Sequence, residues 1–391
     1  MFRAYKYRIS PTNSQKELIA KHIGSSRFVY NLALETKNGA YLGSKHNFSP
    51  FDLIKQLPEL KKECEWLKEV NSQSLQQSIQ NMDIAFKRFF KGAGFPKFKS
   101  KHKGSQSFSI PQNVIVENNL LIIPKFKKKG IKIIIHREIK GTIKSATISR
   151  TPTGKYFVSI LVDTYQKMPV KVPIKEETTI GVDLGIKTFL VTSNGLEIEN
   201  PKNLRKAQAK LKYVQRKYSK NKGKRTKHRL ALLHEKVVNK RKDFLHKTST
   251  KLIRENQTIA LENLAVNNMV KNHNLAQAIT DVSWSMFVDM LKYKADWYGK
   301  NILRIGRWSP SSRTCSCGVI NKDLKLSDRT WTCKSCGVTH DRDILAANNI
   351  KSFALKNNLS GEHTLKNQDE LLTLFKVLTP EAHPIASGVG G

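Results

Sequence analysis

Hydrophobic and polar residues change their spacing several times along the chain, and each change predicts a different structure. Residues 1–9 alternate between apolar and polar side chains, which predicts a short strand, and Ser10 and Pro11 predict a helix start as cap and first residue. The segment 72–91 has helical spacing, with an apolar stripe of Leu75, Ile79, Met82, Phe86 and Phe89 or Phe90. From about 106 to 164 the chain has short β-type runs between turn residues, as in a small barrel or sandwich. A helical insertion within a β-domain is therefore expected.

The second half begins after a stretch near 168–177 that is rich in Pro and charge and predicts a linker. Three strand candidates with very short connections follow and are expected to be antiparallel neighbours: TTIGVDLGI, KTFLVTSN and LEIEN. A fourth strand is predicted at 258–263, a helix at about 280–298 with Gly299 as its C-cap, and a fifth strand at 301–308. This order is that of a ribonuclease H-like fold, in which the first strand, the fourth strand and a later helix bring acids to one sheet edge.

Three acidic residues stand where a metal-dependent nuclease needs them. Asp183 and Glu262 each follow an apolar β-type run, and Asp343 stands at the head of an Ala-rich helix. Carboxylates from two strand ends and a helix can hold two divalent ions about 3.5–4 Å apart, as phosphodiester hydrolysis requires. Oxygen-only ligands favour Mg²⁺, so two catalytic Mg²⁺ ions are expected. Asp341 competes for the third position; Asp343 is favoured because it directly heads ILAANNI.

The charge balance predicts a polyanionic partner. The 391 residues include 69 Lys and Arg against 31 Asp and Glu, a formal net charge of +38. Such an excess attracts polyanions and makes their binding salt-dependent, so nucleic acid is the expected substrate. No apolar run approaches the roughly 18–20 residues of a spanning helix, and the N-terminus lacks the apolar region of a secretory signal. We expect a cytoplasmic, nucleoid-associated protein without a membrane partner or small-molecule substrate.

The most basic stretch, 202–254, contains 20 Lys and Arg and only two acids, Glu235 and Asp243. Its apolar residues keep a helical period, which predicts a helical hairpin that turns near SKNKGKRTK. A solvated helix pair is the plain interpretation. The one-signed charge favours contact with a nucleic-acid backbone.

Four of the five cysteines fall within 22 residues, as CSC at 315–317 and CKSC at 333–336. A zinc ribbon has the pattern C-x2-C-x15–20-C-x2-C, so Cys315, Cys317, Cys333 and Cys336 are the predicted ligands of one structural Zn²⁺. The first pair is one residue short, and the usual turn cannot form there in the same way. A metal-free loop is the alternative, and His340 is a possible substitute ligand. Cys64 has helical surroundings and is interpreted as a core thiol.

These residues together carry a resemblance. The segments GVDLGIK, IALENLAVNNMVKNHNL, RWSPSSRTCS, CKSCG and DRDILAANNI stand in an order and spacing that resemble the TnpB family, the OrfB-type proteins of bacterial insertion sequences. MFRAYKYRISPTNSQKELI and the turn GFPKFKS are also similar, so the resemblance covers about residues 1–355. The chain departs from the family at CSC, which is one residue short, and at Leu345, where the family usually has Asn.

The resemblance implies an RNA-guided DNA endonuclease of a transposable element, related to type V CRISPR effector nucleases. Its partners would be a guide RNA and double-stranded target DNA, and it places Asp183, Glu262 and Asp343 at the catalytic, Mg²⁺-binding positions. The implied domains, which match the changes of pattern, are a wedge-like β-barrel at 1–10 and 95–168, a helical recognition region at 11–94, a RuvC-like nuclease at 178–310 and 338–356, a zinc ribbon at 311–337 and a flexible tail at 357–391. Guide pairing would supply specificity, while the protein reads backbone shape and a short flanking DNA motif.

Three other functions share part of this pattern. A nuclease-dead, RNA-guided DNA binder that regulates transposition or transcription is the main alternative, and the intact acids argue against it. A tyrosine-dependent transposase needs a His-x-His motif with a Tyr, which does not appear. An actin- or hexokinase-like ATPase also uses VDLG as a phosphate loop, but the basic hairpin and the cysteines argue against that class.

Overall fold

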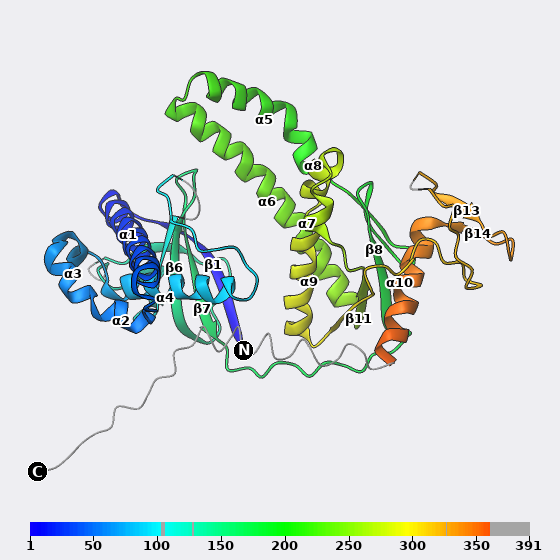
Figure 1. Cartoon of the computed structure of the whole chain (residues 1–391), viewed down its shortest axis with the longest axis horizontal. Helices are drawn as coiled ribbons and strands as arrows, with labels where there is room; N and C mark the ends of the chain where they lie inside the picture. Colours follow the sequence, from blue (N-terminus) through cyan, green and yellow to red (C-terminus); the bar gives the residue numbers. More distant parts are fainter. Residues whose placement is uncertain (103–105, 127–128, 326, 360–391) are drawn as a thin grey trace, which may run out of the picture. The chain divides into compact units, whose positions relative to one another are not determined.

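The computed structural model describes all residues except 103–105, 127–128, 326 and 360–391. The chain forms two compact units (Figure 1). Unit 1 comprises Met1–Lys167 with the segment Gly223–Leu232, and unit 2 comprises the remaining described residues. Among the helices of the described part, none combines the length and apolar character needed to cross a bilayer.

Unit 1 contains a seven-stranded antiparallel sheet in the order β2-β6-β7-β1-β5-β4-β3. Its strands are β1 (Phe2–Ser10), β2 (Gln106–Ile110), β3 (Ile115–Glu117), β4 (Leu120–Ile122), β5 (Ile131–Ile134), β6 (Thr142–Arg150) and β7 (Tyr156–Asp163). The predicted first strand is confirmed: β1 lies in the interior of the sheet and pairs with β7 from Phe2 opposite Asp163 to Ile9 opposite Tyr156. The chain end and the later strands thus build one sheet.

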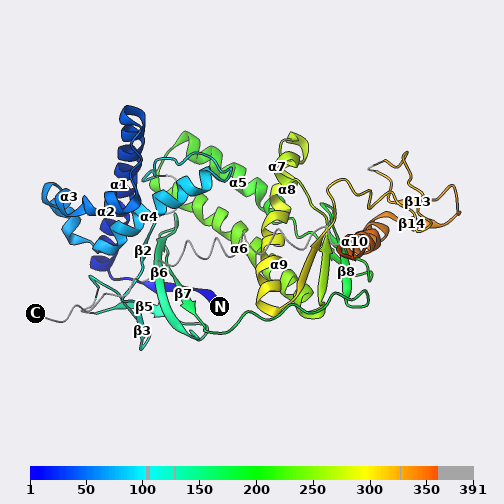
Figure 2. The same cartoon turned by 60° about the horizontal axis from the view of Figure 1, so that its bottom comes forward.

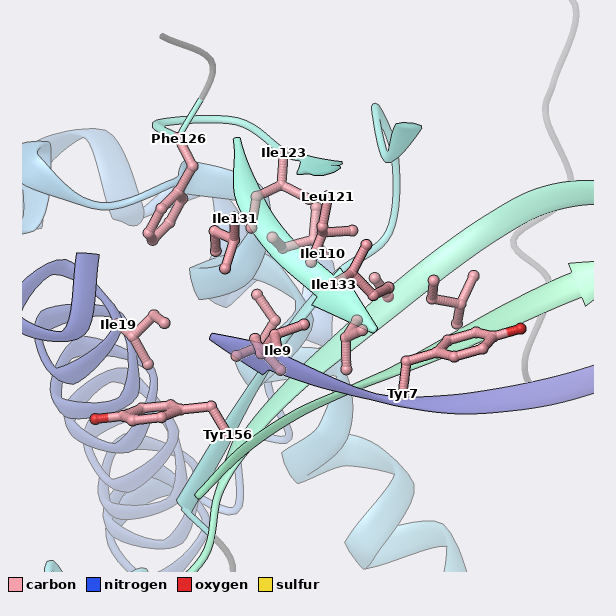
Figure 3. Close-up of a cluster of buried hydrophobic side chains, with 14 of the residues drawn as sticks. Tyr7, Ile9, Ile19, Ile110, Leu121, Ile123, Phe126, Ile131, Ile133 and Tyr156 are labelled. Carbon is pink, nitrogen blue, oxygen red and sulfur yellow. The ribbon is translucent and has the colours of Figure 1, made fainter. Parts of the chain in front are cut away.

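Alternation along β1 decides which face of this sheet is buried. Tyr7 and Ile9 point into one apolar cluster, which they share with Ile19 from α1 and Tyr156 from β7 (Figure 3). Burying such a side chain stabilises the fold by about 1.5–3 kcal/mol, so this face fixes the register of the sheet.

The predicted helical insertion is present between β1 and β2. It consists of α1 (Asn13–Ser44), α2 (Pro50–Lys55), α3 (Leu57–Glu63), a short 3-10 helix (Glu65–Glu69) and α4 (Ser72–Phe89). The predicted cap of α1 is wrong: Thr12, not Ser10, caps it and forms a capping box with Gln15. Thr12 is the cap because its hydroxyl reaches the Gln15 N–H, while Ser10 still belongs to β1. Cys64 packs at the edge of the helical core, as predicted for a core thiol.

A buried histidine links α1 to α4. The His22 Nε2 atom accepts the Asn71 N–H at 3.0 Å, and Nδ1 lies 2.8 Å from the Leu18 carbonyl oxygen. Burial lowers the pKa of His22 to about 4, so the imidazole is neutral at pH 7. Nδ1 is therefore the protonated nitrogen, because Nε2 accepts.

Unit 2 contains a five-stranded mixed sheet in the order β10-β9-β8-β11-β12. Its strands are β8 (Thr179–Leu184), β9 (Thr188–Thr192), β10 (Glu197–Glu199), β11 (Thr258–Leu261) and β12 (Asn301–Arg304). The three predicted antiparallel neighbours are confirmed as β8, β9 and β10, while β8, β11 and β12 run parallel. The last strand is shorter than the predicted 301–308.

Helices cover both faces of this sheet. The second half of the chain forms α5 (Asn203–Lys220), α6 (Lys224–Glu255), α7 (Val266–Met269), α8 (His273–Val282), α9 (Trp284–Tyr298) and α10 (Arg342–Leu359). Of these, α9 packs on one face of the sheet and α10 on the other, and the first residues of α6, up to Leu232, belong to unit 1. On β11, Ile259 and Leu261 join the cluster that contains Phe287 of α9, whereas Ala260 joins the cluster that contains Ile350 of α10. Both views show α10 running beside β8 (Figures 1 and 2).

Four further predictions concern the second half of the chain. The basic stretch forms two helices, α5 and α6, separated by a short turn, as predicted. The helix predicted at about 280–298 is confirmed as α9, but it begins only at Trp284, because Ser283 adopts φ 58° and separates it from α8. Gly299, with φ 62°, ends α9 as predicted. The tail predicted from 357 is shortened because α10 continues to Leu359, and 360–391 lie outside the described residues.

Candidate active site

Two carboxylates meet at the ends of neighbouring parallel strands. Asp183 lies near the end of β8, and Glu262 directly follows β11. The register pairs Val182 with Leu261, so the next residue on each strand is Asp183 and Glu262. Parallel strands end at the same edge of a sheet, which explains why residues far apart in sequence become neighbours.

The third carboxylate arrives on α10, which packs closely against β8. A Cβ atom placed on Gly181 would lie 1.9 Å from the Ala347 carbonyl oxygen, so only glycine permits this approach. Asp183 is two residues beyond Gly181 on the same strand face, and Asp343 is one helical turn before Ala347. The close packing therefore carries Asp343 toward Asp183.

The charges of the three carboxylates act on one another. The pKa of Asp183 is raised to about 7, first because burial removes the carboxyl from water and then because Glu262 and Asp343 repel a further negative charge. Arg342 opposes this effect only in part. Repulsion among three carboxylates makes this arrangement unfavourable without a cation, and a bound cation would offset the repulsion. The oxygen-only ligands fit Mg²⁺.

Sequence reasoning missed the partners that orient two of these carboxylates. The Ser311 hydroxyl donates to Glu262 Oε1 at 2.5 Å, and Arg329 lies 3.3 Å from Asp343 Oδ1. Asn349 of α10 donates to the Ser311 and Thr314 carbonyls at 2.7 and 2.6 Å, which fixes the loop that carries Ser311. The only signal for Ser311 was its position after the last strand of the sheet, on the side where the strands end.

Asp341 has a different role from its neighbour Asp343. Its Oδ1 atom accepts the backbone N–H groups of Asp343 and Ile344, both at 3.0 Å. Asp341 is therefore the N-cap of α10. Asp343 points its carboxylate elsewhere, toward Arg329 and within electrostatic range of Asp183.

The four predicted zinc ligands come together. The Sγ atoms of Cys315, Cys317, Cys333 and Cys336 all lie within 4.8 Å of one another. Cys315 and Cys336 are 3.5 Å apart, and Cys317 and Cys333 are 3.8 Å apart. Tetrahedral zinc with Zn–S bonds near 2.3 Å needs sulfur separations of about 3.8 Å, so these spacings fit the ion.

The short cysteine pair forms a tighter turn than the normal pair. Gly318 N–H donates to the Cys315 carbonyl at 2.9 Å, whereas Gly337 N–H reaches the Cys333 carbonyl one residue further back. Both glycines have positive φ, 90° and 69°, a region that disfavours other residues. The tighter turn thus compensates for the missing residue, and the Cys317 sulfur still lies within 4.8 Å of the other three.

The cysteine ribbon, defined here as residues 311–341, is attached to α10. It includes the strands β13 (Thr330–Thr332) and β14 (Thr339–Asp341), and α10 begins at the next residue. Leu345, at the position where the family usually has Asn, is buried with Cys315, Trp331 and Cys333. His340 Nε2 lies 3.0 Å from Cys315 Sγ, and its ring packs against Trp331.

Family profiles and a solved structure match most of this chain. A family profile described as "Probable transposase" (OrfB_IS605) matches residues 159–273, a Cas12f1-like TNB domain profile matches 284–350, and a helix-turn-helix profile matches 1–45. Residues 1–45 here form β1 and the single helix α1. A solved structure of a Cas12f1-sgRNA-target DNA complex aligns over 87% of this chain and 83% of its own, with a TM-score of 0.54 and 15% identity.

Two curated relatives are similar over nearly their whole length. A Streptomyces pristinaespiralis protein named "Putative RNA-guided DNA endonuclease" is 37% identical, with 92% of this chain and 91% of the relative covered. The similarly named InsQ of Escherichia coli K12 is 30% identical, with 89% and 91% covered.

The sheet order and the likeness to Cas12f1 define a RuvC-like nuclease fold with a TNB domain. The chain belongs to the TnpB family, as the sequence predicted.

Proposed function

We propose that this chain is an RNA-guided DNA endonuclease of a transposable element and that it hydrolyses phosphodiester bonds at Asp183, Glu262 and Asp343. The observation that carries the proposal is the convergence of three carboxylates: Asp183 and Glu262 stand at matching ends of the parallel strands β8 and β11, and the close β8–α10 contact carries Asp343 toward them. Burial and the two neighbouring carboxylates also raise the pKa of Asp183. Perturbed acids on a nuclease fold are strong candidates for metal-binding catalysts. The names of the relatives support RNA guidance and DNA as the substrate.

The carboxylates would hold two Mg²⁺ ions, which would supply the activation of a water and the stabilisation of the leaving 3′ oxygen. The protein's own contribution is to orient the ligands: Ser311 positions Glu262, and the tight β8–α10 contact positions Asp343. We also propose that one Zn²⁺ binds Cys315, Cys317, Cys333 and Cys336 and fixes the cysteine ribbon beside the start of α10.

The basic helices would contact the nucleic-acid backbone. The buried Asp281 accepts the N–H groups of Leu204 and Arg205 at the start of α5, and it lies 3.4 Å from Arg241 of α6. Asp281 thereby holds both basic helices on α8. Neutralising Lys206, Lys210 and Lys217 should weaken nucleic-acid binding for every sequence and reduce its salt slope by about three, one for each phosphate that is no longer neutralised. A loss restricted to some sequences would contradict the backbone role.

The seven-stranded sheet and helices α1–α4 are proposed as the wedge and recognition parts of this nuclease. They would read the shape of the guide-target duplex and a short flanking DNA motif. The nuclease domain would follow the boundaries predicted from the sequence, except that α10 extends it to Leu359 and the cysteine ribbon continues to Asp341.

The test is to express the chain with the DNA that flanks its gene, sequence the RNA that co-purifies, and replace the guide segment of that RNA. Plasmid cleavage with Mg²⁺ should follow the new guide, and Asp183→Asn should bind the same target without cutting it. Guided binding without cleavage by the wild-type chain would favour the regulator. Absence of bound RNA and of guided binding would contradict the proposal.

A further inference from the structure

A basic, aromatic segment of unit 1 has no place in the active site. Positions 84–116 contain seven Lys and Arg and no acidic residue. Within them, the 90–99 loop follows α4 and includes the GFPKFKS motif. This motif belongs to the family resemblance, but the carboxylate cluster and the cysteine ribbon do not use it.

Two sets of contacts fix the 90–99 loop. The Phe95 ring packs edge-on against Phe86 and Phe89, with ring centroids 5.6 and 5.2 Å apart. At the other end, the Asn31 side chain donates to the Lys99 carbonyl at 3.0 Å and accepts the Lys99 N–H at 2.7 Å. The loop is therefore held at both ends against the helices of its own unit.

Two aromatic rings of this fixed loop remain in solvent. Phe90 is 80% exposed and Phe98 is 59% exposed, whereas Phe95 at 49% is partly covered by its aromatic neighbours. Lys91 and Lys97 stand directly beside the two exposed rings and are themselves exposed. The Phe90 ring touches Phe89, with centroids 5.3 Å apart, but the fold leaves most of both exposed rings uncovered. Their presentation on an anchored, basic loop indicates an external partner.

The chemistry of this surface suits unpaired nucleotides. Aromatic rings stack on any base, and adjacent lysines pair with the phosphates of the same strand. A duplex hides its base faces, and an acidic protein would use the lysines but not the rings. Resting on the proposed function, we propose that the 90–99 loop binds unpaired nucleotides of the guide RNA, with Phe90 and Phe98 as stacking platforms.

The choice of RNA follows from where the carboxylates lie. Asp183, Glu262 and Asp343 all belong to unit 2, so a strand held by unit 1 need not be the strand that is cut. A guide RNA offers unpaired, splayed bases before any target is bound, and such bases are the usual target of protein recognition in RNA. Duplex DNA offers them only after it is opened.

The experiment measures binding of a short single-stranded RNA carrying 2-aminopurine to the full chain freed of co-purified RNA. Phe90→Leu and Phe98→Leu keep an apolar side chain but remove the ring. Each single variant, and the double variant that combines them, should weaken binding about fivefold or more. Each should also reduce the quenching of 2-aminopurine fluorescence that stacking causes. Phe51→Leu is the matched control, because Phe51 is 67% exposed in the same unit but stands beside Asp52.

An RNA of the same length without bases should bind wild type and the double variant equally. Lys91→Gln with Lys97→Gln should lower the salt slope by about two, with stacking retained. Unchanged binding and quenching in the double Phe variant would overturn the stacking role while leaving the nuclease proposal intact. Tighter binding of the matching single-stranded DNA would overturn the assignment to RNA. Failure of the wild-type chain to bind any RNA would instead overturn the proposed function.

Discussion

The carboxylate cluster and the cysteine ribbon both gather side chains of metal-binding types next to α10, but they are assembled in opposite ways. The ribbon gathers its four cysteines from 22 consecutive residues through two glycine turns. The carboxylates come from β8, the end of β11 and α10, and only the sheet register and the Gly181 contact bring them together. One cluster depends on local turns, and the other depends on the whole of unit 2.

This difference has a consequence for how each cluster can fail. A local site tolerates a change of spacing, since the turn after Cys315 absorbs one missing residue. A long-range site cannot adjust in the same way, because displacing α10 moves Asp343 relative to both strands. Leu345 and Asp343 lie two residues apart on α10, so the ribbon supports one side of the carboxylate cluster.

The largest expected effect comes from removing one carboxylate charge. Asp183→Asn should reduce guided cleavage more than about 100-fold, beyond the 10–100-fold typical of outer-shell partners of a metal. The protein should unfold at the same temperature or higher, because the substitution removes charge repulsion in a partly buried cluster. Cleavage assays and thermal unfolding measure the two effects. Asp289→Asn, an exposed carboxylate of the same unit, should change neither. Retained cleavage in Asp183→Asn would remove this residue from the site.

The second prediction displaces a carboxylate without changing any ligand. Gly181→Ala forces a Cβ atom into the Ala347 carbonyl, which should cost about 1–3 kcal/mol of stability or more and greatly reduce cleavage. Zinc content should stay the same, because the ribbon folds from local turns. Gly39→Ala is the control: it lies in α1 with no atom within 4 Å of the added Cβ and should stabilise slightly. Loss of zinc in Gly181→Ala would show that the two clusters are not independent.

The contrast between local and long-range contacts also explains which features could be predicted from the sequence. Apolar β-type runs and short connections were enough for β8, β9 and β10, and the basic helices followed from the apolar period. The start of α9 was placed a few residues too early because nothing in the sequence marks Ser283 as a break, and only the backbone shows its left-handed conformation. Ser311 and Arg329 were missed because their roles depend on long-range contacts with Glu262 and Asp343. Thr12 displaced Ser10 as the helix cap because β1 extends by one residue more than the pattern indicated.

A third, smaller effect concerns His340 beside the cysteines. Because four sulfurs lie within 4.8 Å of one another and can complete a zinc site, His340 is expected to act as an outer partner of Cys315 and not as a ligand. His340→Ala should then lower zinc affinity by about 10–100-fold in a chelator competition, while the spectrum of the Co²⁺-substituted protein keeps four thiolate ligands. Lys334→Ala, an exposed change between Cys333 and Cys336, should leave affinity unchanged. A Co²⁺ spectrum that loses a nitrogen ligand in His340→Ala would make His340 a direct ligand instead.

The smallest expected effect distinguishes the roles of Asp341 and Asp343, which stand where the cysteine ribbon joins α10. Asp341 caps α10, so Asp341→Ala should cost about 1 kcal/mol, measured by thermal unfolding, and Asp341→Asn should cost less because asparagine also caps helices. Both variants should keep most of their cleavage, since the Asp341 carboxylate caps α10 through the Asp343 and Ile344 N–H groups. Asp343→Asn, two positions away and equally conservative, should stop cleavage while the cap and the zinc remain. If Asp341→Asn instead stops cleavage and Asp343→Asn does not, the third carboxylate of the site has been assigned to the wrong residue, and the register between α10 and β8 would have to be revised with it.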